Sequence, residues 1–303
     1  MGILVQPESK LMRLAKELGL ESIAWSLRRL YCPVDRKALV LEVGSGGRPY
    51  FRSNVLLDAY ENTRQRHWDT LVSDRPTVLG FVENLPFKDK TFDFVIASHV
   101  LEHSSDPERF LLELQRVAKA GYIESPDAFM ERINPYKDHR SEITMRNNRL
   151  LIRKKKASIC DKELVELYEQ FAKPAVAGRL IPAQPFLFHI RYYWQGTIDF
   201  VVINPEQDAG WPAPENEDKE ASALSFRSHV SGFMLKLIRT TLSQGTRNNK
   251  IDLADLMRCP NCSSITMAWQ EHDMVCPKCH QRYPAQNGIL NMLTPQLKTE
   301  GPK

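Results

Sequence analysis

The sequence predicts an α/β protein, in which helices cover both faces of a mainly parallel sheet, followed by a small metal-binding module. Between residues 39 and 126, short apolar runs of strand length alternate with polar stretches that contain turn signals and one clear helix. Four of the six cysteines, Cys259, Cys262, Cys276 and Cys279, lie close together near the C-terminal end. Such clustering indicates a metal site rather than disulfides.

Length and composition set the class of protein. A chain of 303 residues is long enough for one large domain with an appendage, or for two domains. The net charge of +4 is too small to indicate binding to nucleic acid or membranes by itself. The sequence has no run of about 18 apolar residues and no recognisable secretory signal. We therefore expect no membrane insertion and a cytoplasmic protein.

The elements of the first two thirds follow from local patterns. Residues 1–35 are expected to form a helical segment, because apolar side chains recur there at roughly helical spacing: Leu11, Leu14, Ala15, Leu18, Ile23, Leu27 and Leu30. Strands are expected at 39–43, 54–58, 78–82, 92–97 and 122–125. A helix is expected over 107–119, with Asp106 as its cap and Pro107 in its first position.

The chain after residue 125 carries weaker signals. We expect a strand over 148–156, a helix over 161–171 and a hairpin within 189–204 that turns at Gln195 and Gly196. The aromatic side chains of Tyr192, Tyr193 and Trp194 could either stack on a ligand or belong to the core.

These patterns divide the chain into five parts. After the helical segment, residues 36–204 are interpreted as the α/β domain, of which 127–204 form a cap that faces the substrate. An acidic, proline-rich linker over 205–222 and a helix over 223–250 are expected next. The cysteine module takes residues 251–293.

A glycine turn follows the first strand, in the stretch LVLEVGSGGRPYFRSNVLLDAY. Pro49 stands where the third glycine of a dinucleotide-binding turn would be, which argues against a nicotinamide or flavin. Gly44 and Gly46 would let the backbone approach a ligand, and Asp58, at the end of the second strand, could accept both hydroxyls of a ribose. Taken alone, the glycines fit an ordinary tight turn equally well.

The next stretch, GFVENLPFKDKTFDFVIASHVLEHSSDPERFLLELQRVAKAGYIESP, resembles the class I S-adenosylmethionine-dependent methyltransferases of the type 11 group. The resemblance implies a Rossmann-like sheet with a site for S-adenosyl-L-methionine (SAM) at the carboxyl ends of its strands. It places Glu42, Gly44 and Gly46 at the methionine part, Asp58 at the ribose, Glu83, Asn84 and Leu85 near the adenine, and Ser98 at the closing edge.

One position departs from the family pattern. Phe81 stands where these enzymes usually have an acid that contacts the adenine amine. Either Glu83 takes over this contact, or backbone groups and packing against Phe81 hold the adenine.

Three histidines are candidates for catalysis: His99, His103 and His139. Methyl transfer needs mainly positioning, and it needs a base only when the acceptor carries a proton of high pKa. His103 could instead satisfy backbone groups of its turn together with Glu102, and His139 could be an exposed loop residue. The stretch Ser98-His99-Val100-Leu101 does not match the Pro-Pro motif of enzymes that methylate planar nitrogens, which favours an oxygen or carbon acceptor.

The acceptor is expected to be a glycan or a small metabolite. Residues 121–156 look similar to a bacterial subgroup of these enzymes that is associated with surface polysaccharides. Two alternatives remain open at this point: a methyltransferase acting on tRNA or protein, and a SAM-binding scaffold without activity, which the missing acid at Phe81 would suit.

The four cysteines occur as CPNC and CPKC, the spacing of a zinc ribbon in which Cys259, Cys262, Cys276 and Cys279 hold a structural Zn²⁺. The surrounding residues resemble the small zinc-ribbon activators that partner and stabilise certain tRNA and release-factor methyltransferases. The resemblance implies an intramolecular contact between the ribbon and the methyltransferase domain. Alternatively, the ribbon could contact the acceptor.

Overall fold

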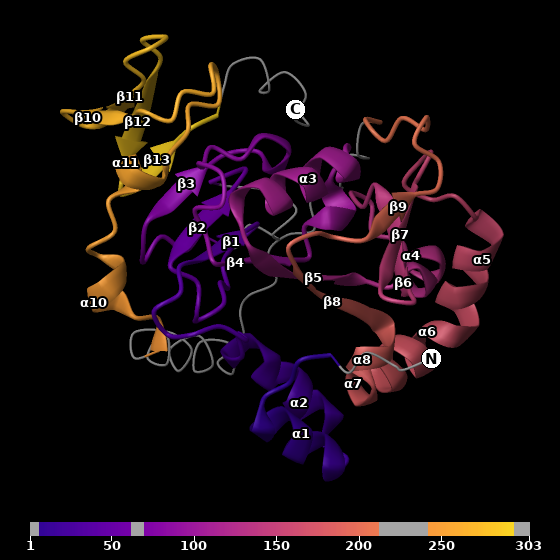
Figure 1. Cartoon of the computed structure of the whole chain (residues 1–303). Coiled ribbons are helices and arrows are strands. Elements are labelled where there is room, and N and C mark those ends of the chain that lie inside the picture. The colour runs from indigo at the N-terminus through magenta and orange to yellow at the C-terminus, as the bar shows by residue number, and fades with distance from the viewer. Residues whose placement is uncertain (1–5, 62–69, 212–241, 294–303) are drawn as a thin grey trace.

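The computed structural model describes residues 6–61, 70–211 and 242–293. Ten strands form one sheet in the order β10-β11-β12-β13-β3-β2-β1-β4-β5-β8, and a smaller sheet has the order β6-β7-β9 (Figure 1). The centre of the large sheet is parallel and contains the five strands that the sequence predicts: β1 (Val40–Val43), β2 (Val55–Asp58), β3 (Thr77–Leu79), β4 (Phe94–Ser98) and β5 (Ala120–Pro126). The α/β fold class predicted from the alternating pattern is therefore confirmed.

The helix α3 (Pro107–Val117) covers one face of this sheet. The Asp106 side chain accepts a hydrogen bond from the N–H of Arg109 and so caps the helix as predicted. Because side chains alternate between the two faces of a strand, Leu41, Val95 and their odd-numbered neighbours point into the same core as the buried stripe of α3.

The opposite face combines a second apolar cluster with buried charge. Val40, Ile96 and Tyr122 lie in this cluster, and the alternation places Glu42 and Glu124 on the same face. The N-terminal segment lies on this side, with α1 (Lys10–Glu17), α2 (Glu21–Leu27) and the 3-10 turn η1 (Arg28–Leu30).

The helices α1 and α2 bury few side chains. Met12, Ala15 and Ala24 are buried, whereas most of the leucines and isoleucines in the predicted stripe are exposed: Leu11, Leu14, Leu18, Ile23 and Leu30. The ring of Trp25, which packs edge-on against Phe186, joins α2 to the cap.

The cap consists of the small sheet and a run of short helices. A hairpin joins β6 (Ser141–Arg146) to β7 (Arg149–Lys154) through Asn147 and Asn148, whose φ angles of 50° and 60° suit a tight hairpin turn. The helices are α4 (Ala128–Ile133), α5 (Lys162–Leu167), α6 (Lys173–Ala175), α7 (Ile181–Ala183) and α8 (Pro185–Phe188), with π-helical turns at Tyr168–Ala172 and Val176–Leu180.

The predicted hairpin within 189–204 is wrong. The strand β8 (His189–Gln195) pairs antiparallel with β5, whereas β9 (Phe200–Val202) pairs with β7 in the small sheet. Gln195 and Thr197 form a single bridge, after which the N–H of buried Ile198 donates to the side chain of Gln115. This contact directs the chain away from β8. Tyr192 and Trp194 point into the core.

The C-terminal module extends the large sheet. It contains α11 (Leu253–Leu256), β10 (Ala268–Gln270), β11 (Asp273–Val275), β12 (Arg282–Gln286) and β13 (Ile289–Asn291). The strand β13 pairs parallel with β3, with Leu290 opposite Val78. In Figure 1 the module therefore lies at the β3 edge of the sheet.

The predicted linker and helix before the module lie largely outside the described residues, which resume at 242. The described part of that helix contains α10 (Gly245–Asn248), a single short turn. Asn248 in this turn accepts a hydrogen bond from the side chain of buried Asn54, at 2.7 Å. This bond attaches α10 to the residue that precedes β2. Of the helices that the structure describes, none has the length and apolar character needed to cross a membrane.

Candidate functional site

The glycine turn after β1 brings three parts of the chain together. Gly44 has a φ of 64°, and a Cβ atom there would lie 2.2 Å from a methyl group of Val100 in the loop after β4. Gly46, with a φ of 55°, donates its N–H to the Asp58 carboxylate at 2.9 Å. The N–H of Tyr60 donates to the other carboxylate oxygen at 3.2 Å. The turn, the end of β2 and the loop after β4 thus meet at the carboxyl edge of the sheet.

Glu42 lies beneath this turn and binds the loop that follows it. One of its oxygens accepts hydrogen bonds from the Ser53 hydroxyl at 2.6 Å and from the Tyr50 N–H at 2.8 Å. Burial raises the pKa of Glu42 to about 7, although these hydrogen bonds and Arg29 oppose the shift. Glu42 is therefore a buried acid whose charge state changes near neutral pH.

The residues predicted near the adenine make different contacts. Asn84 donates to the carbonyl of Pro260 in the C-terminal module at 3.2 Å, and the buried Leu85 donates its N–H to Glu113. Glu83 accepts a hydrogen bond from the Ser104 hydroxyl. Phe81 packs edge-on against Tyr60, with ring centroids 6.2 Å apart, so an aromatic pair lies next to Asp58.

Glu124 is a buried residue of this site that the sequence analysis missed. Its carboxylate accepts two hydrogen bonds from the Arg28 guanidinium, at 2.6 and 2.9 Å, one from the Tyr122 hydroxyl and one from the predicted site residue Ser98, at 2.9 Å. Although burial favours the neutral acid, the hydrogen bonds and charges of Arg28 and His99 hold the pKa of Glu124 well below its usual range. The only local signal was an acid inside a buried strand.

His99 lies between two carboxylates. Its Nδ1 is 3.3 Å from Glu102 and its Nε2 is 3.3 Å from Glu124. Burial favours the neutral ring, but the two carboxylates outweigh it and raise the pKa of His99 to about 10. This arrangement favours the protonated ring, in which each nitrogen faces a carboxylate.

The other two predicted histidines lie together beside Glu102. The rings of His103 and His139 meet edge-on, with centroids 4.6 Å apart. One possible ligand atom from each of Glu102, His103 and His139 lies within 4.8 Å of the others. Burial and the neighbouring His139 lower the pKa of His103, although Glu102 and Asp138 oppose the shift.

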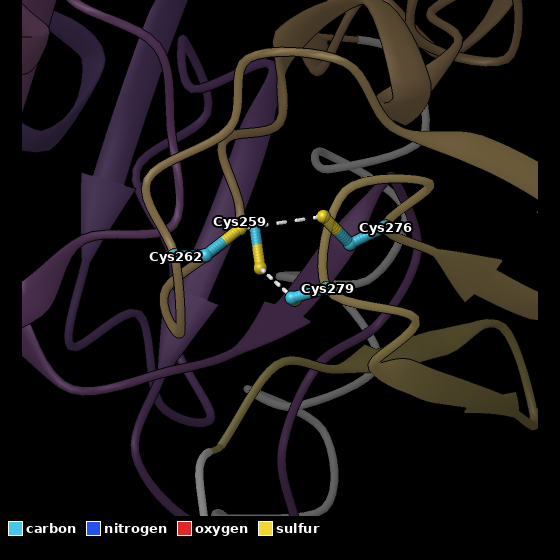
Figure 2. A group of neighbouring side chains, drawn as sticks. All are labelled: Cys259, Cys262, Cys276 and Cys279. Carbon is cyan, nitrogen blue, oxygen red and sulfur yellow. Dashed lines mark hydrogen bonds between the residues drawn. The ribbon is translucent and has the colours of Figure 1, made fainter.

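The four cysteines of the module also form one cluster (Figure 2). The sulfurs of Cys259 and Cys279 are 3.6 Å apart, and those of Cys262 and Cys276 are 3.5 Å apart. These distances are too long for disulfides, whose sulfurs are about 2.05 Å apart. They fit thiolates at the corners of a tetrahedron with metal–sulfur distances of about 2.3 Å.

The two Cys-x-x-Cys loops have the same backbone geometry. The N–H of Ser263 donates to the carbonyl of Cys259, and the N–H of His280 donates to the carbonyl of Cys276, both at 2.8 Å. Ser263 and His280 both have φ angles near 60°. The hydroxyl of Tyr283 lies 3.2 Å from the Cys259 sulfur, as expected of a group that supports a thiolate ligand. The donor set thus fits a closed four-thiolate site.

The module also contacts the α/β domain at the Leu-Pro-Phe stretch, residues 85–87, and at Lys88. The N–H of Arg258 donates to the carbonyl of Pro86, and the N–H of Lys88 donates to the carbonyl of Leu256. Phe87 and Met257, which form a bridge between these segments, are fully buried.

A family model described as a methyltransferase domain matches residues 41–123, the span from β1 into β5 that carries the glycine turn, Asp58 and the loop after β4. This segment is therefore similar to a methyltransferase domain, and it supplies the candidate site apart from Glu124, His139 and the N-terminal Arg28.

Short matches to known proteins fall within curated methyltransferases. An uncharacterized methyltransferase of Schizosaccharomyces pombe is 51% identical over 43 residues, which are 14% of this chain and 16% of that protein. Norajmaline N-methyltransferase of Rauvolfia serpentina is 46% identical over 43 residues, which are 14% of this chain and 15% of that enzyme. The chain thus spans only a small part of the length of these relatives.

The solved complex between the Trm112 methyltransferase activator of Haloferax volcanii and a methyltransferase is also similar in part. The alignment is 14% identical with a TM-score of 0.35, and it covers 62% of this chain and 94% of that chain.

Proposed function

We propose that the protein transfers a methyl group from SAM to a hydroxyl oxygen of a glycan or a small metabolite. The observation that carries this proposal is the turn of the methyltransferase domain at the carboxyl edge of the parallel sheet, where Gly46 and Asp58 are joined by a hydrogen bond. Ligands of open α/β sheets bind at this edge.

In the proposed complex, Asp58 accepts the ribose hydroxyls, and Gly44 and Gly46 border the methionine part. Glu42 supports this turn from below. The adenine lies near Glu83 and the aromatic pair of Phe81 and Tyr60, which compensates for the acid that Phe81 replaces. Asn84 and Leu85 border the adenine by packing, because the Asn84 side chain and the Leu85 N–H bind the protein. Ser98 closes the pocket on the side of Glu124.

The proposed reaction is a direct displacement. The acceptor oxygen attacks the methyl carbon of the sulfonium, so that an oxygen–carbon bond forms while the sulfur–carbon bond breaks, and the hydroxyl proton is released to water. Positioning of the two reactants supplies most of the rate enhancement in such a step. The cationic His99 faces the edge where the acceptor would enter.

We further propose that Cys259, Cys262, Cys276 and Cys279 hold a structural zinc ion. The tetrahedral spacing of the sulfurs and the Tyr283 hydroxyl beside Cys259 support this assignment. A closed shell of four thiolates would leave no open position for catalysis. The module would then stabilise the α/β domain of the same chain through its contacts with β3 and with residues 85–87.

Transfer of a labelled methyl group tests the proposed function. The full chain is incubated with methyl-labelled SAM and with glycan, small-molecule, tRNA and protein fractions of a lysate, beside Asp58→Ala and the control Asp89→Ala, whose side chain is 70% exposed. We expect label in the glycan or small-molecule fraction, lost with Asp58→Ala and kept with Asp89→Ala. Label in tRNA or protein would overturn the proposed acceptor, and SAM binding without transfer to any fraction would favour a scaffold.

A further inference from the structure

The cluster of Glu102, His103 and His139 lies apart from the cysteines. Glu102 and His103 belong to the 3-10 turn η4 (Leu101–His103) after β4, and His139 comes from the loop before β6. Glu102 is 1% exposed and His139 is 5% exposed. The sequence separates His139 from the other two residues, but the fold brings one donor atom of each within 4.8 Å of the others.

Two residues of this cluster have polar atoms without a hydrogen-bond partner, although His99 and Asp138 lie close to them. Within the described residues, neither carboxylate oxygen of the buried Glu102 accepts a hydrogen bond, and Nδ1 of His103 has no hydrogen-bond partner. The nearest cation to Glu102 is His99, at 3.3 Å from one oxygen, and Asp138 lies 3.4 Å from His103 Nδ1. Buried polar atoms without partners are costly, and in native proteins a bound water or ion is one of the usual reasons for them.

His139 is also oriented as a ligand. Its Nδ1 donates a hydrogen bond to Glu131 at 2.7 Å, which leaves the lone pair on Nε2. The other oxygen of Glu131 accepts a hydrogen bond from the ammonium of Lys155 at 2.6 Å, and both partners are almost fully buried. A carboxylate that orients a histidine through its second nitrogen is the usual arrangement behind metal-binding histidines.

We propose that Glu102, His103 and His139 bind a divalent transition-metal ion. Two imidazole nitrogens and one carboxylate oxygen suit Mn²⁺, Fe²⁺, Co²⁺ or Zn²⁺. Three protein ligands leave positions open for water or a substrate oxygen. Val100, between His99 and Leu101 in the same loop, contacts the glycine turn, so the metal site borders the carboxyl edge of the sheet.

The metal site would also take part in the proposed function, and its role with the acceptor rests on that proposal. An open metal position would bind the acceptor hydroxyl and lower its pKa, as divalent metals do for bound water. The hydroxyl would lose its proton to water, and its oxygen would then bond to the methyl carbon while the sulfur–carbon bond of SAM breaks and the demethylated cofactor leaves. This role assigns to the metal the activation that a histidine base would otherwise supply.

Binding of Mn²⁺ to the full chain tests the site. The metal-free protein is first given one equivalent of zinc per chain, which the four thiolates take up in preference to nitrogen and oxygen ligands, so that the second site stays open to Mn²⁺. Free Mn²⁺ is then followed by electron paramagnetic resonance during a titration. We expect one saturable site per chain, at least tenfold weaker in Glu102→Gln and in His139→Asn. Glu131→Gln should weaken it roughly 10- to 100-fold, as loss of a group that orients a ligand does.

The exposed His272 supplies the control, because His272→Gln should leave Mn²⁺ binding unchanged. Circular dichroism checks the fold of each variant, and His103→Asn, a less buried position, replaces any variant that does not fold. Unaltered affinity in folded Glu102→Gln, or no saturable binding of Mn²⁺ or Co²⁺, would overturn the proposal. Calorimetry with SAM on the same samples separates the two ideas: Mn²⁺ binding without SAM binding overturns only the proposed function, and the reverse overturns only the metal site.

Discussion

At Gly44, the lack of a side chain lets two loops close against each other. Val100 fills the space that a Cβ would need, and the φ of 64° is one that other residues rarely adopt. We predict that Gly44→Ala weakens SAM binding more than tenfold in calorimetry, because the added methyl group displaces Val100 and distorts the turn. Gly178→Ala, where the added atom meets nothing within 4 Å, is the matched control.

The double variant Gly44→Ala/Val100→Ala distinguishes the clash from the backbone strain. Removing the Val100 methyl groups should restore part of the affinity, while the strain of the positive φ remains. If the single variant binds SAM as tightly as the unaltered chain, the turn does not border the cofactor.

Glu42 makes the stability of the folded protein depend on pH, and a variant of this residue can isolate the effect. Its pKa in the folded state, about 7, lies above the ordinary value of 4.5, so the folded state holds this proton more tightly than the unfolded state does. The contribution of Glu42 to stability is therefore lost as the pH rises from about 4.5 to about 7. Relative to Glu42→Gln, the unaltered chain should lose up to about 3 kcal/mol of unfolding free energy over this range, at about 1.4 kcal/mol per pKa unit.

Urea unfolding of both proteins at several pH values measures this difference. A constant difference between them from pH 4 to 8 would show that Glu42 has an ordinary pKa.

Among the elements, η1 and β5 are joined by a buried ion pair. The Arg28 side chain is 8% exposed and that of Glu124 is 0% exposed. We predict that Arg28→Met lowers the free energy of unfolding by about 3–5 kcal/mol, because it removes the cation that donates two hydrogen bonds to a buried carboxylate. Urea unfolding should show that Arg28→Met/Glu124→Gln recovers part of this loss.

The neighbouring, more exposed Arg29 provides the comparison. Arg29→Met should cost less than about 1 kcal/mol, as surface charges usually do. Equal losses at both positions would mean that the N-terminal segment contributes through packing rather than through the ion pair.

The ion pair also illustrates what the sequence could not predict. The central strands were predictable because buried apolar runs mark them locally, and the cysteine cluster because its ligands have characteristic spacing. Arg28 and Glu124 are 96 residues apart, and no local pattern connects them. The histidines were recognised singly, but their grouping around Glu102 depends on where the loop before β6 lies. The prediction that β8 and β9 pair with each other was wrong for the same reason, since each strand pairs with a strand that is distant in the sequence.

On the scale of the whole molecule, the module and the α/β domain share one core. Met257, Met274 and Tyr283 of the module belong to the same buried cluster as Val78 and Leu114. We predict that chelation of the proposed zinc lowers the melting temperature of the entire protein in one cooperative transition. Differential scanning calorimetry with and without chelator measures this change, and Cys259→Ser should reproduce it, whereas Cys160→Ser, at an exposed cysteine, should not.

Two separate transitions, with only one of them sensitive to chelator, would show instead that the module unfolds independently of the sheet.

The pairing of β13 with β3 has a consequence for biosynthesis. More than 200 residues separate Val78 from Leu290. During translation, the edge of β3 therefore stays unpaired until nearly all the described chain has left the ribosome. An open strand edge in a nascent chain invites pairing with other chains. Synthesis that stalls before residue 251 should therefore yield an aggregation-prone product, because the strand that covers the β3 edge would be missing.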